Sequence, residues 1–426
     1  MKIKKILKRL LHLHPKSVDL SLVRIKRLLK DLKNPERKIE NSIQVVGTNG
    51  KHSFCTALRE IFETANYKVN LNISPSLRKF NERYYFCGKS ISDEKLYDLL
   101  TEVEKINKDQ QITFHEFICA CFFLEASRNK SDVNILESGL FFRLDASNVL
   151  KKNIASVIMP IGMDHKDFLT KGTIEEIVYE KCSHLLKKSK IFISEQENNV
   201  LNKIKKNIAG NSSKKFFFNE NYSYKKNING FTYKDALGKI NLPLPNLLGD
   251  FQISNVSTAI VTARNLDHFK ITDSHIKNAI TKIRSEGRLQ NITHGKLRKY
   301  VSKNNQILID GAHNSLAANV IKKYLETLNS KKKIFMVLGM MKNKEHKKFI
   351  QIFKNKVNSI IALDIPNQTN FIKKEELFKI AKSCGIPSKT ENSIEIALKN
   401  IAKENENAII FCTGSLYFAG EILNLN

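Results

Sequence analysis

The chain has 426 residues, a length that predicts two or three domains rather than one. Hydrophobic residues make up 42% of it, which supplies real cores and excludes wholesale disorder. The formal net charge of +29 can indicate nucleic acid, an anionic membrane or acidic small molecules as partners. Because the lysines are spread along the chain and do not interleave with aromatic residues as in base-stacking proteins, we expect no nucleic-acid partner.

Cysteine usage and hydropathy indicate a compartment. Seven cysteines occur without any Cys-x-x-Cys pair, which argues against a zinc ribbon and a disulfide framework and suits a reducing environment. No apolar run is long enough to span a bilayer. The basic start is followed by an apolar stretch too short for a secretory signal. The sequence therefore predicts a cytoplasmic protein with no membrane partner.

A phosphate-binding loop is predicted at residues 45–53, Val-Val-Gly-Thr-Asn-Gly-Lys-His-Ser. It follows the β-branched run 43–46 and precedes apolar residues at helical spacing over 54–65. Backbone N–H groups and the helix dipole would then face an anion, Lys51 would serve the β- and γ-phosphates, and Ser53 would offer a hydroxyl to Mg²⁺. A valine replaces the first glycine of G-x-x-x-x-G-K-[ST] and the hydroxyl comes one residue late, so an ordinary strand–turn–helix remains the alternative.

Strand and helix patterns alternate up to about residue 200. The runs 133–136 and 154–159 predict strands that lead into Glu137 and Asp164-His165, and residues 173–176 fit a capping box that opens a helix. Alternation predicts a mostly parallel sheet, whose ligands bind at the carboxyl ends of the strands. A carboxylate there, such as Glu137, can hold Mg²⁺, although a helix cap or a surface carboxylate is the plainer interpretation of that residue alone.

The rest of the chain predicts a smaller domain. Residues 195–240 are polar and weakly periodic, and we interpret them as an insertion or short peripheral strands. A second alternation follows from about residue 300, with strand-like runs at 307–309, 334–338, 360–363 and 408–411. The predicted fold class is α/β, with a P-loop, mostly parallel-sheet domain at 1–295 and a Rossmann-like domain at 296–426.

Several motifs carry a resemblance to a known family. Gly47-Thr-Asn-Gly-Lys51 followed by x-Ser resembles the loop of the Mur ligase superfamily, which makes amide bonds through acyl phosphates. Residues 137–148 resemble the Glu-Val-Gly-Leu-Gly-Gly-Arg-Leu-Asp-Ala-Thr-Asn motif of its folylpolyglutamate synthase/dihydrofolate synthase branch. Asp310-Gly-Ala-His-Asn314 and Thr413-Gly-Ser-Leu-Tyr417 match that branch completely, although a structural helix cap would also explain the second motif.

The resemblance implies a metal site and an ATP site. The implied Mg²⁺ ligands are Ser53, Ser74, Glu137, His165 and Lys181, and the family's equivalent of Lys181 is carbamylated by CO₂ and bridges to a second Mg²⁺. The implied nucleotide contacts are Gly47, Thr48, Asn49, Gly50, Lys51, His52, Ser53, Gln252, Asn255, Arg288, Asp310 and His313. Lys51, His165, Lys181 and Arg288 would be the catalytic residues. Lys344 lies in Asn-Lys-Glu, where the family has Asp-Lys-Asp.

Some positions depart from the family pattern. Phe141 and Phe142 replace two glycines, Ser76 replaces a histidine, Phe251 replaces the histidine before Gln252, and His52 separates the lysine from the serine. Bulky rings at the first two positions would narrow the pocket or change its substrate.

The predicted function is ATP-dependent ligation of L-glutamate to a pterin carboxylate through an acyl phosphate. The resemblance implies dihydropteroate, the tails of reduced folates, or both as acceptors, with ATP and Mg²⁺ as cofactors and a monomeric protein. Two alternatives remain open. One is a related amide ligase with another carboxylate acceptor; the other is a catalytically impaired nucleotide-binding protein or a P-loop ATPase acting on nucleic acid.

Overall fold

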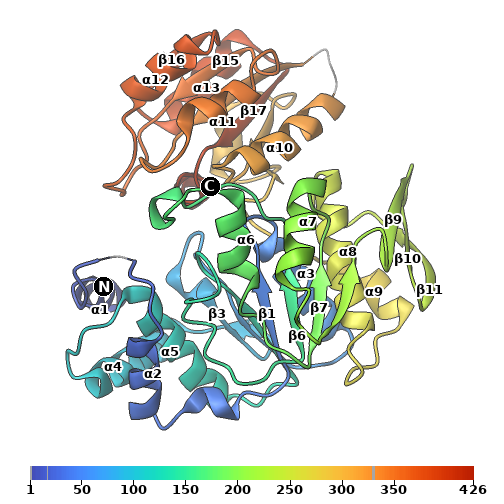
Figure 1. Cartoon of the computed structure of the whole chain (residues 1–426). Coiled ribbons are helices and arrows are strands. Elements are labelled where there is room, and N and C mark those ends of the chain that lie inside the picture. Colours follow the sequence, from blue (N-terminus) through green and yellow to red (C-terminus); the bar gives the residue numbers. More distant parts are fainter. Residues whose placement is uncertain (1, 17, 329–331) are drawn as a thin grey trace. The chain divides into compact units, whose positions relative to one another are not determined.

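The computed structural model describes residues 2–16, 18–328 and 332–426, which form two compact units (Figure 1). Unit 1 comprises Met1–Ile161, Leu169–Asn246 and Ile253–Ile283, and unit 2 comprises Gly162–Phe168, Leu247–Gln252 and Arg284–Asn426. Two short segments, Gly162–Phe168 and Leu247–Gln252, therefore belong to the unit built mainly from the C-terminal part of the chain. The division at residue 295 predicted above stays a prediction.

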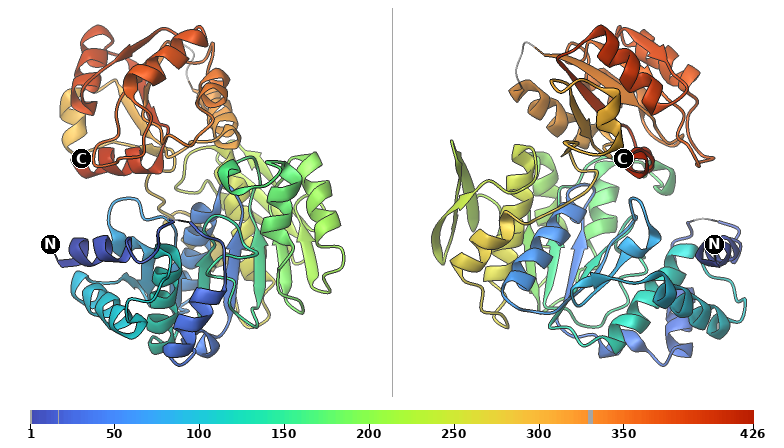
Figure 2. Two further views of the ribbon diagram at one scale, coloured as in Figure 1. Left: turned by 60° about the vertical axis from the view of Figure 1, so that its left-hand side comes forward. Right: turned by 180° about the vertical axis from the view of Figure 1, so that it is seen from behind.

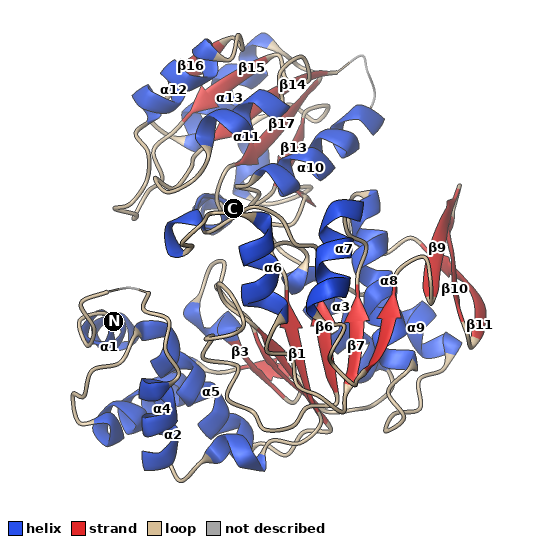
Figure 3. Cartoon of the chain, in the orientation of Figure 1, coloured by secondary structure: helices blue, strands red, loops and turns tan. Residues whose placement is uncertain are grey.

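Unit 1 is built on an eight-stranded sheet in the order β4-β3-β2-β5-β1-β6-β7-β8 (Figure 3). The strands are β1 Ser42–Val46, β2 Val69–Asn72, β3 Tyr84–Phe86, β4 Lys89–Ser90, β5 Val133–Glu137, β6 Ala155–Ile158, β7 Lys190–Ile193 and β8 Lys214–Phe217. Among these strands, only the β2–β3 and β3–β4 pairs are antiparallel. The predicted mostly parallel sheet is confirmed, and every residue of β1 and β5 is buried because both faces of the central strands are covered.

The described helices of unit 1 carry apolar residues toward this sheet or toward one another. They are α1 Lys2–Leu10, α2 Val23–Asp31, α3 Lys51–Thr64, α4 Asp93–Asn107, α5 Phe114–Arg128, α6 Ile174–Cys182, α7 Asn198–Asn207 and α9 Asp273–Ile280. Helix α8 (Asp250–Arg264) begins in unit 2 and continues in unit 1. One of the two hydrogen bonds of the capping box predicted at 173–176 is present, since the Thr173 side chain accepts from the Glu176 N–H. The Glu176 carboxylate accepts instead from the backbone N–H groups of residues 170–172.

The polar region 195–240 contains more regular structure than predicted. It holds α7, whose buried Val200 and Ile204 are four residues apart, and β8, which joins the main sheet. Strands β9 Tyr222–Asn227, β10 Gly230–Asp235 and β11 Gly238–Pro243 form a separate three-stranded antiparallel sheet. This small sheet stands beside α9 (Figure 2). Short strands were expected here, whereas three apolar residues in a lysine- and asparagine-rich stretch gave too weak a helical pattern to predict α7.

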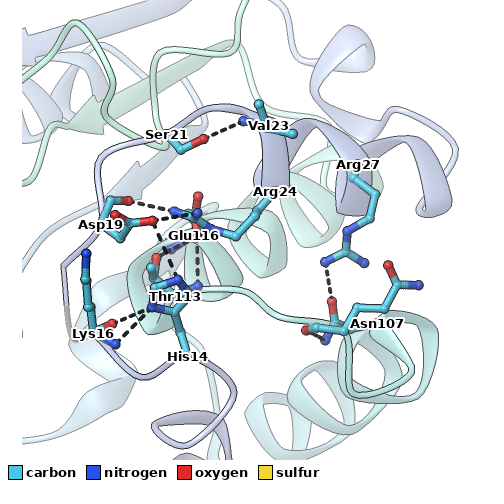
Figure 4. A network of polar contacts seen from close by, with 11 residues as sticks. His14, Lys16, Asp19, Ser21, Val23, Arg24, Arg27, Asn107, Thr113 and Glu116 are labelled. Carbon is cyan, nitrogen blue, oxygen red and sulfur yellow. Dashed lines mark hydrogen bonds and ion pairs between the residues drawn. The ribbon is translucent and has the colours of Figure 1, made fainter.

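A network of charged side chains joins the segment before α2 to the start of α5 (Figure 4). Arg24 donates to Asp19 Oδ2 at 2.7 Å and to Glu116 Oε2 at 2.9 Å. The same Glu116 oxygen accepts from the N–H and the hydroxyl of Thr113, both at 2.8 Å, and so completes the capping box of α5. His14 Nε2 lies 3.6 Å from Asp19. The network fixes the N-terminal segment to the first turn of α5.

Unit 2 has a six-stranded sheet in the order β12-β13-β17-β14-β15-β16. The strands are β12 Gln290–Asn291, β13 Gln306–Ile309, β14 Lys333–Leu338, β15 Ser359–Ala362, β16 Ser388–Thr390 and β17 Ala408–Thr413, and the helices are α10 Ser315–Thr327, α11 His346–Ile352, α12 Lys374–Ser383, α13 Ile394–Glu404 and α14 Leu416–Leu425. Four of these strands coincide with the predicted runs, and only β12 is antiparallel to its neighbour. Across the described residues, no helix combines the length and apolar character needed to cross a bilayer.

Candidate active site

The phosphate loop of unit 1 lies between β1 and α3 and depends on two glycines. Gly47 and Gly50 have φ of +149° and +80°. A Cβ on Gly47 would lie 2.7 Å from the Cβ of Met159, and one on Gly50 would lie 2.6 Å from Asn255 Oδ1. The N–H groups of Thr48 and Asn49 donate to the Pro160 carbonyl at 2.8 and 3.1 Å. The loop is therefore held against the segment that follows β6, with Asn255 packed on its tip.

Lys51 and Ser53 stand in the first turn of α3 and are both buried. Lys51 Nζ donates to the carbonyl oxygens of Gly47 at 3.0 Å and Thr48 at 3.3 Å, so its ammonium group lies along the loop. The N-terminus of α3, with its dipole and this ammonium, forms the anion-binding arrangement that the sequence predicts. The structure thus brings Lys51, Ser53 and Asn255 of the predicted nucleotide set together in unit 1.

A buried carboxylate follows β5 at the same edge of the sheet. Glu137 is 4% exposed, and its Oε2 accepts from the Ser74 N–H at 3.2 Å. Ser74 comes after β2, which pairs in parallel with β5, so the ends of the two strands meet. Arg83 donates to the Ser74 hydroxyl at 3.3 Å. Carboxylate and hydroxyl oxygens are the hard ligands that suit Mg²⁺, which needs few protein ligands because it keeps several waters.

The described residues contain no group of three or more His, Cys, Asp or Glu side chains placed to hold a metal ion. A magnesium site built from one carboxylate, hydroxyls and water does not require such a group. The donors present at the β2 and β5 ends therefore fit Mg²⁺ and argue against a zinc-type site.

Lys181, in the last turn of α6, is 2% exposed. Its Nζ donates to the carbonyl oxygens of Gly47 at 3.0 Å and Leu140 at 2.7 Å, and lies 5.4 Å from the centroid of the Phe141 ring. The rings of Phe141 and Phe142 are 1% and 0% exposed. Both rings are packed inside unit 1, and their effect on the pocket or its substrate stays a prediction.

A second polar cluster lies in unit 2 around Asp164. Its side chain is 7% exposed and accepts from Lys344 Nζ at 2.6 Å. His313 Nε2 lies 3.2 Å from Asp164 Oδ2, and Asn314 donates to the same oxygen at 3.1 Å. Burial opposes ionisation, but His313, His165 and Lys344 outweigh it and hold the pKa of Asp164 well below its usual range. His165 itself adopts φ +55°, an uncommon backbone conformation for a residue other than glycine.

Asp310 organises the loops after β13. Its Oδ1 accepts from the Ala312 N–H and its Oδ2 from the Leu289 N–H, both at 2.7 Å. Burial raises the pKa of the Asp310 carboxyl against the opposing effect of Arg288 and these N–H groups. Arg288 precedes one of the two anchored residues, so Asp310 fixes the backbone on which Arg288 stands.

The second complete motif, Thr413–Tyr417, forms a helix cap. Ser415 Oγ accepts from the Tyr417 N–H at 3.1 Å at the start of α14. Gly414 has φ +112°, and a Cβ there would lie 2.5 Å from the Gly339 carbonyl oxygen. The structural explanation left open for this motif accounts for its glycine and serine.

Comparison with known proteins identifies the family. The Mur ligase middle domain matches residues 45–263, and the dihydrofolate synthetase C-terminal domain matches residues 290–425. A dihydrofolate synthase/folylpolyglutamate synthase of Buchnera aphidicola is 30% identical over 391 residues, covering 89% of this chain and 88% of the relative. The chain belongs to the dihydrofolate synthase/folylpolyglutamate synthase family. The enzyme of that name from Bacillus subtilis is 28% identical over 429 residues, 94% of each chain.

Solved structures of this family share the fold. Escherichia coli FolC in complex with DHPP and ADP superposes with a TM-score of 0.88 at 23% identity, over 99% of this chain and 97% of FolC. Mycobacterium tuberculosis folylpolyglutamate synthase complexed with ADP and AMPPCP gives 0.86 at 22% identity, over 100% and 99%. The resemblance and the α/β fold class predicted from the sequence are confirmed.

One charged pair of this family member was missed by sequence reasoning. His115 Nε2, in the first turn of α5, lies 3.3 Å from Asp145 Oδ2, which also accepts from the Gly139 N–H at 3.0 Å. Burial opposes the imidazolium, but Cys119 and Asp145 outweigh it and raise the pKa of His115 well above its usual value. The pKa of Asp145 is lowered, since His115 and Ser147 outweigh the effect of burial. The capping box Thr-x-x-Glu at 113–116 could have located this helix start.

Proposed function

We propose that the protein is an ATP-dependent ligase that joins L-glutamate to the carboxylate of dihydropteroate, of a reduced folate glutamate tail, or of both, through an acyl phosphate. The observation that carries the proposal is the phosphate loop beside the buried Glu137–Ser74 pair in a chain of this family. Curated relatives that cover most of this chain bear the names of both activities.

The proposed reaction has two chemical steps. The acceptor carboxylate attacks the γ-phosphorus in line with the departing ADP, which forms the acyl phosphate and breaks the bond between the β- and γ-phosphates. The glutamate amine then attacks the acyl carbon, forms the amide, and expels inorganic phosphate with loss of a proton. Phosphoryl transfer leaves the protein little covalent work, so positioning and charge compensation by residues such as Lys51 and Arg288 carry the catalysis.

We propose Ser53, Ser74, Glu137 and His165 as the residues that would hold Mg²⁺, which neutralises phosphate charge when bound. Lys181 completes the proposed set; in the structure its Nζ donates to two carbonyl oxygens. Beyond residues 47–53, the proposed nucleotide contacts are Gln252, Asn255, Arg288, Asp310 and His313. The proposed setting is a cytoplasmic monomer acting on small molecules.

The magnesium assignment has a direct test. Glu137→Gln keeps the size of the side chain and removes its charge, so the Mg²⁺ concentration for half-maximal turnover should rise about tenfold or more. Glu195→Gln, at an exposed carboxylate elsewhere in unit 1, is the control. An unchanged Mg²⁺ requirement in Glu137→Gln would remove Glu137 from the metal site.

The function is tested by ADP release with Mg·ATP and L-glutamate, comparing dihydropteroate, tetrahydrofolate and no acceptor. Turnover with dihydropteroate alone means a dedicated dihydrofolate synthase, and turnover with both acceptors means a bifunctional enzyme. No turnover with either acceptor, in protein that still binds ATP, would overturn the proposal and favour a different carboxylate acceptor or a binding protein.

A further inference from the structure

An ion pair joins the motif at 137–148 to the last turn of α6. Arg143 belongs to that motif, and Glu180 directly precedes Lys181 in the chain. Arg143 Nε donates to Glu180 Oε1 at 3.0 Å and Oε2 at 3.1 Å, and Arg143 Nη2 donates to Oε1 at 2.8 Å. The planar guanidinium thus holds both carboxylate oxygens, the geometry that makes an arginine–carboxylate pair strong and directional.

The backbone joins the same two segments. The N–H groups of Phe142 and Arg143 donate to the Glu180 carbonyl oxygen at 3.1 and 2.8 Å. Glu180 therefore accepts hydrogen bonds from this loop through both its main chain and its side chain. The Glu180 side chain is 12% exposed and the Arg143 side chain 30%, so water screens the pair less than it screens most surface ion pairs.

The loop that carries Arg143 follows β5 and is closed on itself. The N–H and the hydroxyl of Ser138 both donate to the Val45 carbonyl oxygen of β1 at 2.9 Å. Asp145 Oδ2 accepts from the Gly139 N–H at 3.0 Å, which ties the two ends of the loop together. A loop held at its start and across its ends moves as one piece, so a bond at Arg143 positions the whole of it.

Each partner of the pair lies close in the chain to a proposed magnesium ligand. Glu137 ends β5 just before the loop, and Lys181 follows Glu180 in α6. Mg²⁺ demands a near-octahedral set of donors, so a small shift between these elements would weaken its binding. We propose that the Arg143–Glu180 pair positions the end of β5 relative to the end of α6, and through them the two metal ligands. Both are positioning residues, and the inference rests on the proposed Mg²⁺ site.

The plainer alternative is an ion pair that only stabilises the fold, and unit 1 contains such a pair for comparison. Arg128 also donates through two nitrogen atoms to both carboxylate oxygens of Glu102, at a more exposed position where the side chains are 46% and 39% exposed. That pair joins α5 to α4, and neither helix carries a proposed metal ligand. The two pairs share their geometry and differ in what they connect, so Arg128 supplies a matched control.

Metal affinity tests the proposal without any turnover. Mn²⁺ is titrated into the whole protein in the presence of the ATP analogue AMPPNP, and free Mn²⁺ is followed by electron paramagnetic resonance. Arg143→Gln and Glu180→Gln should each weaken Mn²⁺ binding about tenfold, as expected when a residue that orients a metal ligand is lost. Arg128→Gln should bind Mn²⁺ as the wild type does. Thermal unfolding of each variant measures the change in stability separately.

The double variant shows whether the two side chains act as one unit. Because each single change breaks the same interaction, Arg143→Gln combined with Glu180→Gln should weaken Mn²⁺ binding by no more than about threefold beyond either change alone. Losses that multiply in the double variant would overturn the proposal. Lower thermal stability with unchanged Mn²⁺ affinity would also overturn it, since the pair would then serve the fold alone.

The inference and the ligase proposal fail on different results. A wild type that binds Mn²⁺ and AMPPNP but turns over no acceptor would overturn the proposed function, and weaker Mn²⁺ binding in Arg143→Gln would still support the positioning role. Ligase turnover in the wild type, with Mn²⁺ affinity unchanged by both single substitutions, would overturn the positioning role and leave the proposed function intact. A wild type that binds no Mn²⁺ would overturn the metal site and the inference with it.

Discussion

The lysines at the phosphate loop of unit 1 and in the Asp164 cluster of unit 2 face different partners. In unit 1, Lys51 and Lys181 both donate to the carbonyl oxygen of Gly47. In unit 2, Lys344 donates to the Asp164 carboxylate. A carbonyl oxygen orients an ammonium group but leaves its charge uncompensated, whereas a carboxylate orients the group and also compensates its charge. The comparison indicates that the Gly47 carbonyl positions two lysines of unit 1, whereas Asp164 both positions Lys344 and compensates its charge.

Removing a loop cation should have the largest effect. Lys51→Ala should reduce glutamate-dependent ADP release by at least about a hundredfold, since a preorganised charge aimed at the transferring phosphoryl is lost. Circular dichroism should show an intact fold, and Lys89→Ala, at an exposed lysine, should behave as the wild type. Undiminished turnover would exclude Lys51 from the mechanism.

Removing the carboxylate of unit 2 tests the other side of the comparison. Asp164→Asn leaves the largely buried Lys344 ammonium without its compensating charge, so the free energy of unfolding should fall by about 3 kcal/mol. Denaturant unfolding measures this change. Asp364→Asn, at a partly exposed carboxylate of the same unit, should cost far less. Equal losses of unfolding free energy in the two variants would mean that Asp164 does not compensate a buried charge.

The geometry of the loop can be tested without altering its charge. Gly50→Ala introduces a Cβ where φ is +80° and where Asn255 Oδ1 would lie 2.6 Å away. The strained backbone should cost about 1–2 kcal/mol in unfolding free energy and should weaken Mg·ATP binding. Gly210→Ala, where a Cβ meets nothing within 4 Å, is the control. Unchanged ATP affinity in Gly50→Ala would mean that the loop tolerates displacement.

The smallest expected effect belongs to the His115–Asp145 pair, in which a cation of unit 1 does face a carboxylate. Because folding raises the pKa of His115, its imidazolium stabilises the fold. This stabilisation is fully present below the unfolded-state pKa of about 6.5 and is lost as pH rises through the folded-state pKa. Because folding lowers the pKa of Asp145, its carboxylate also stabilises the fold. This stabilisation is present above about pH 3.9 and is lost as pH falls through the folded-state pKa.

His115→Gln should therefore lower the unfolding free energy by about 1 kcal/mol, with the largest difference from the wild type between about pH 4 and 6.5. Urea unfolding at a series of pH values measures it, with His184→Gln at an exposed histidine as control. A difference that does not vary with pH would show that the pair is not ionised.

The sequence predicted local features well because they depend on neighbouring residues. The loop at 47–53 and the strand leading to Glu137 follow from apolar runs and a glycine-lysine pattern. The contacts of Lys181 were not predictable, since Gly47 is 134 residues away and meets it only because β1 lies between β5 and β6. Similarly, no pattern links Asp164 to Lys344, 180 residues later. Motifs located these residues, while the strand order and the non-local packing determine their partners.

The place of Asp164 in the chain bears on how the protein is made. Its segment Gly162–Phe168 belongs to unit 2, yet its partners His313 and Lys344 lie 149 and 180 residues further along. During synthesis the carboxylate leaves the ribosome on the order of ten seconds before those partners exist. A nascent chain can therefore assemble the sheet of unit 1 early, but it completes the Asp164 cluster only after most of unit 2 has been translated. A fragment beginning at Arg284 would lack that carboxylate altogether.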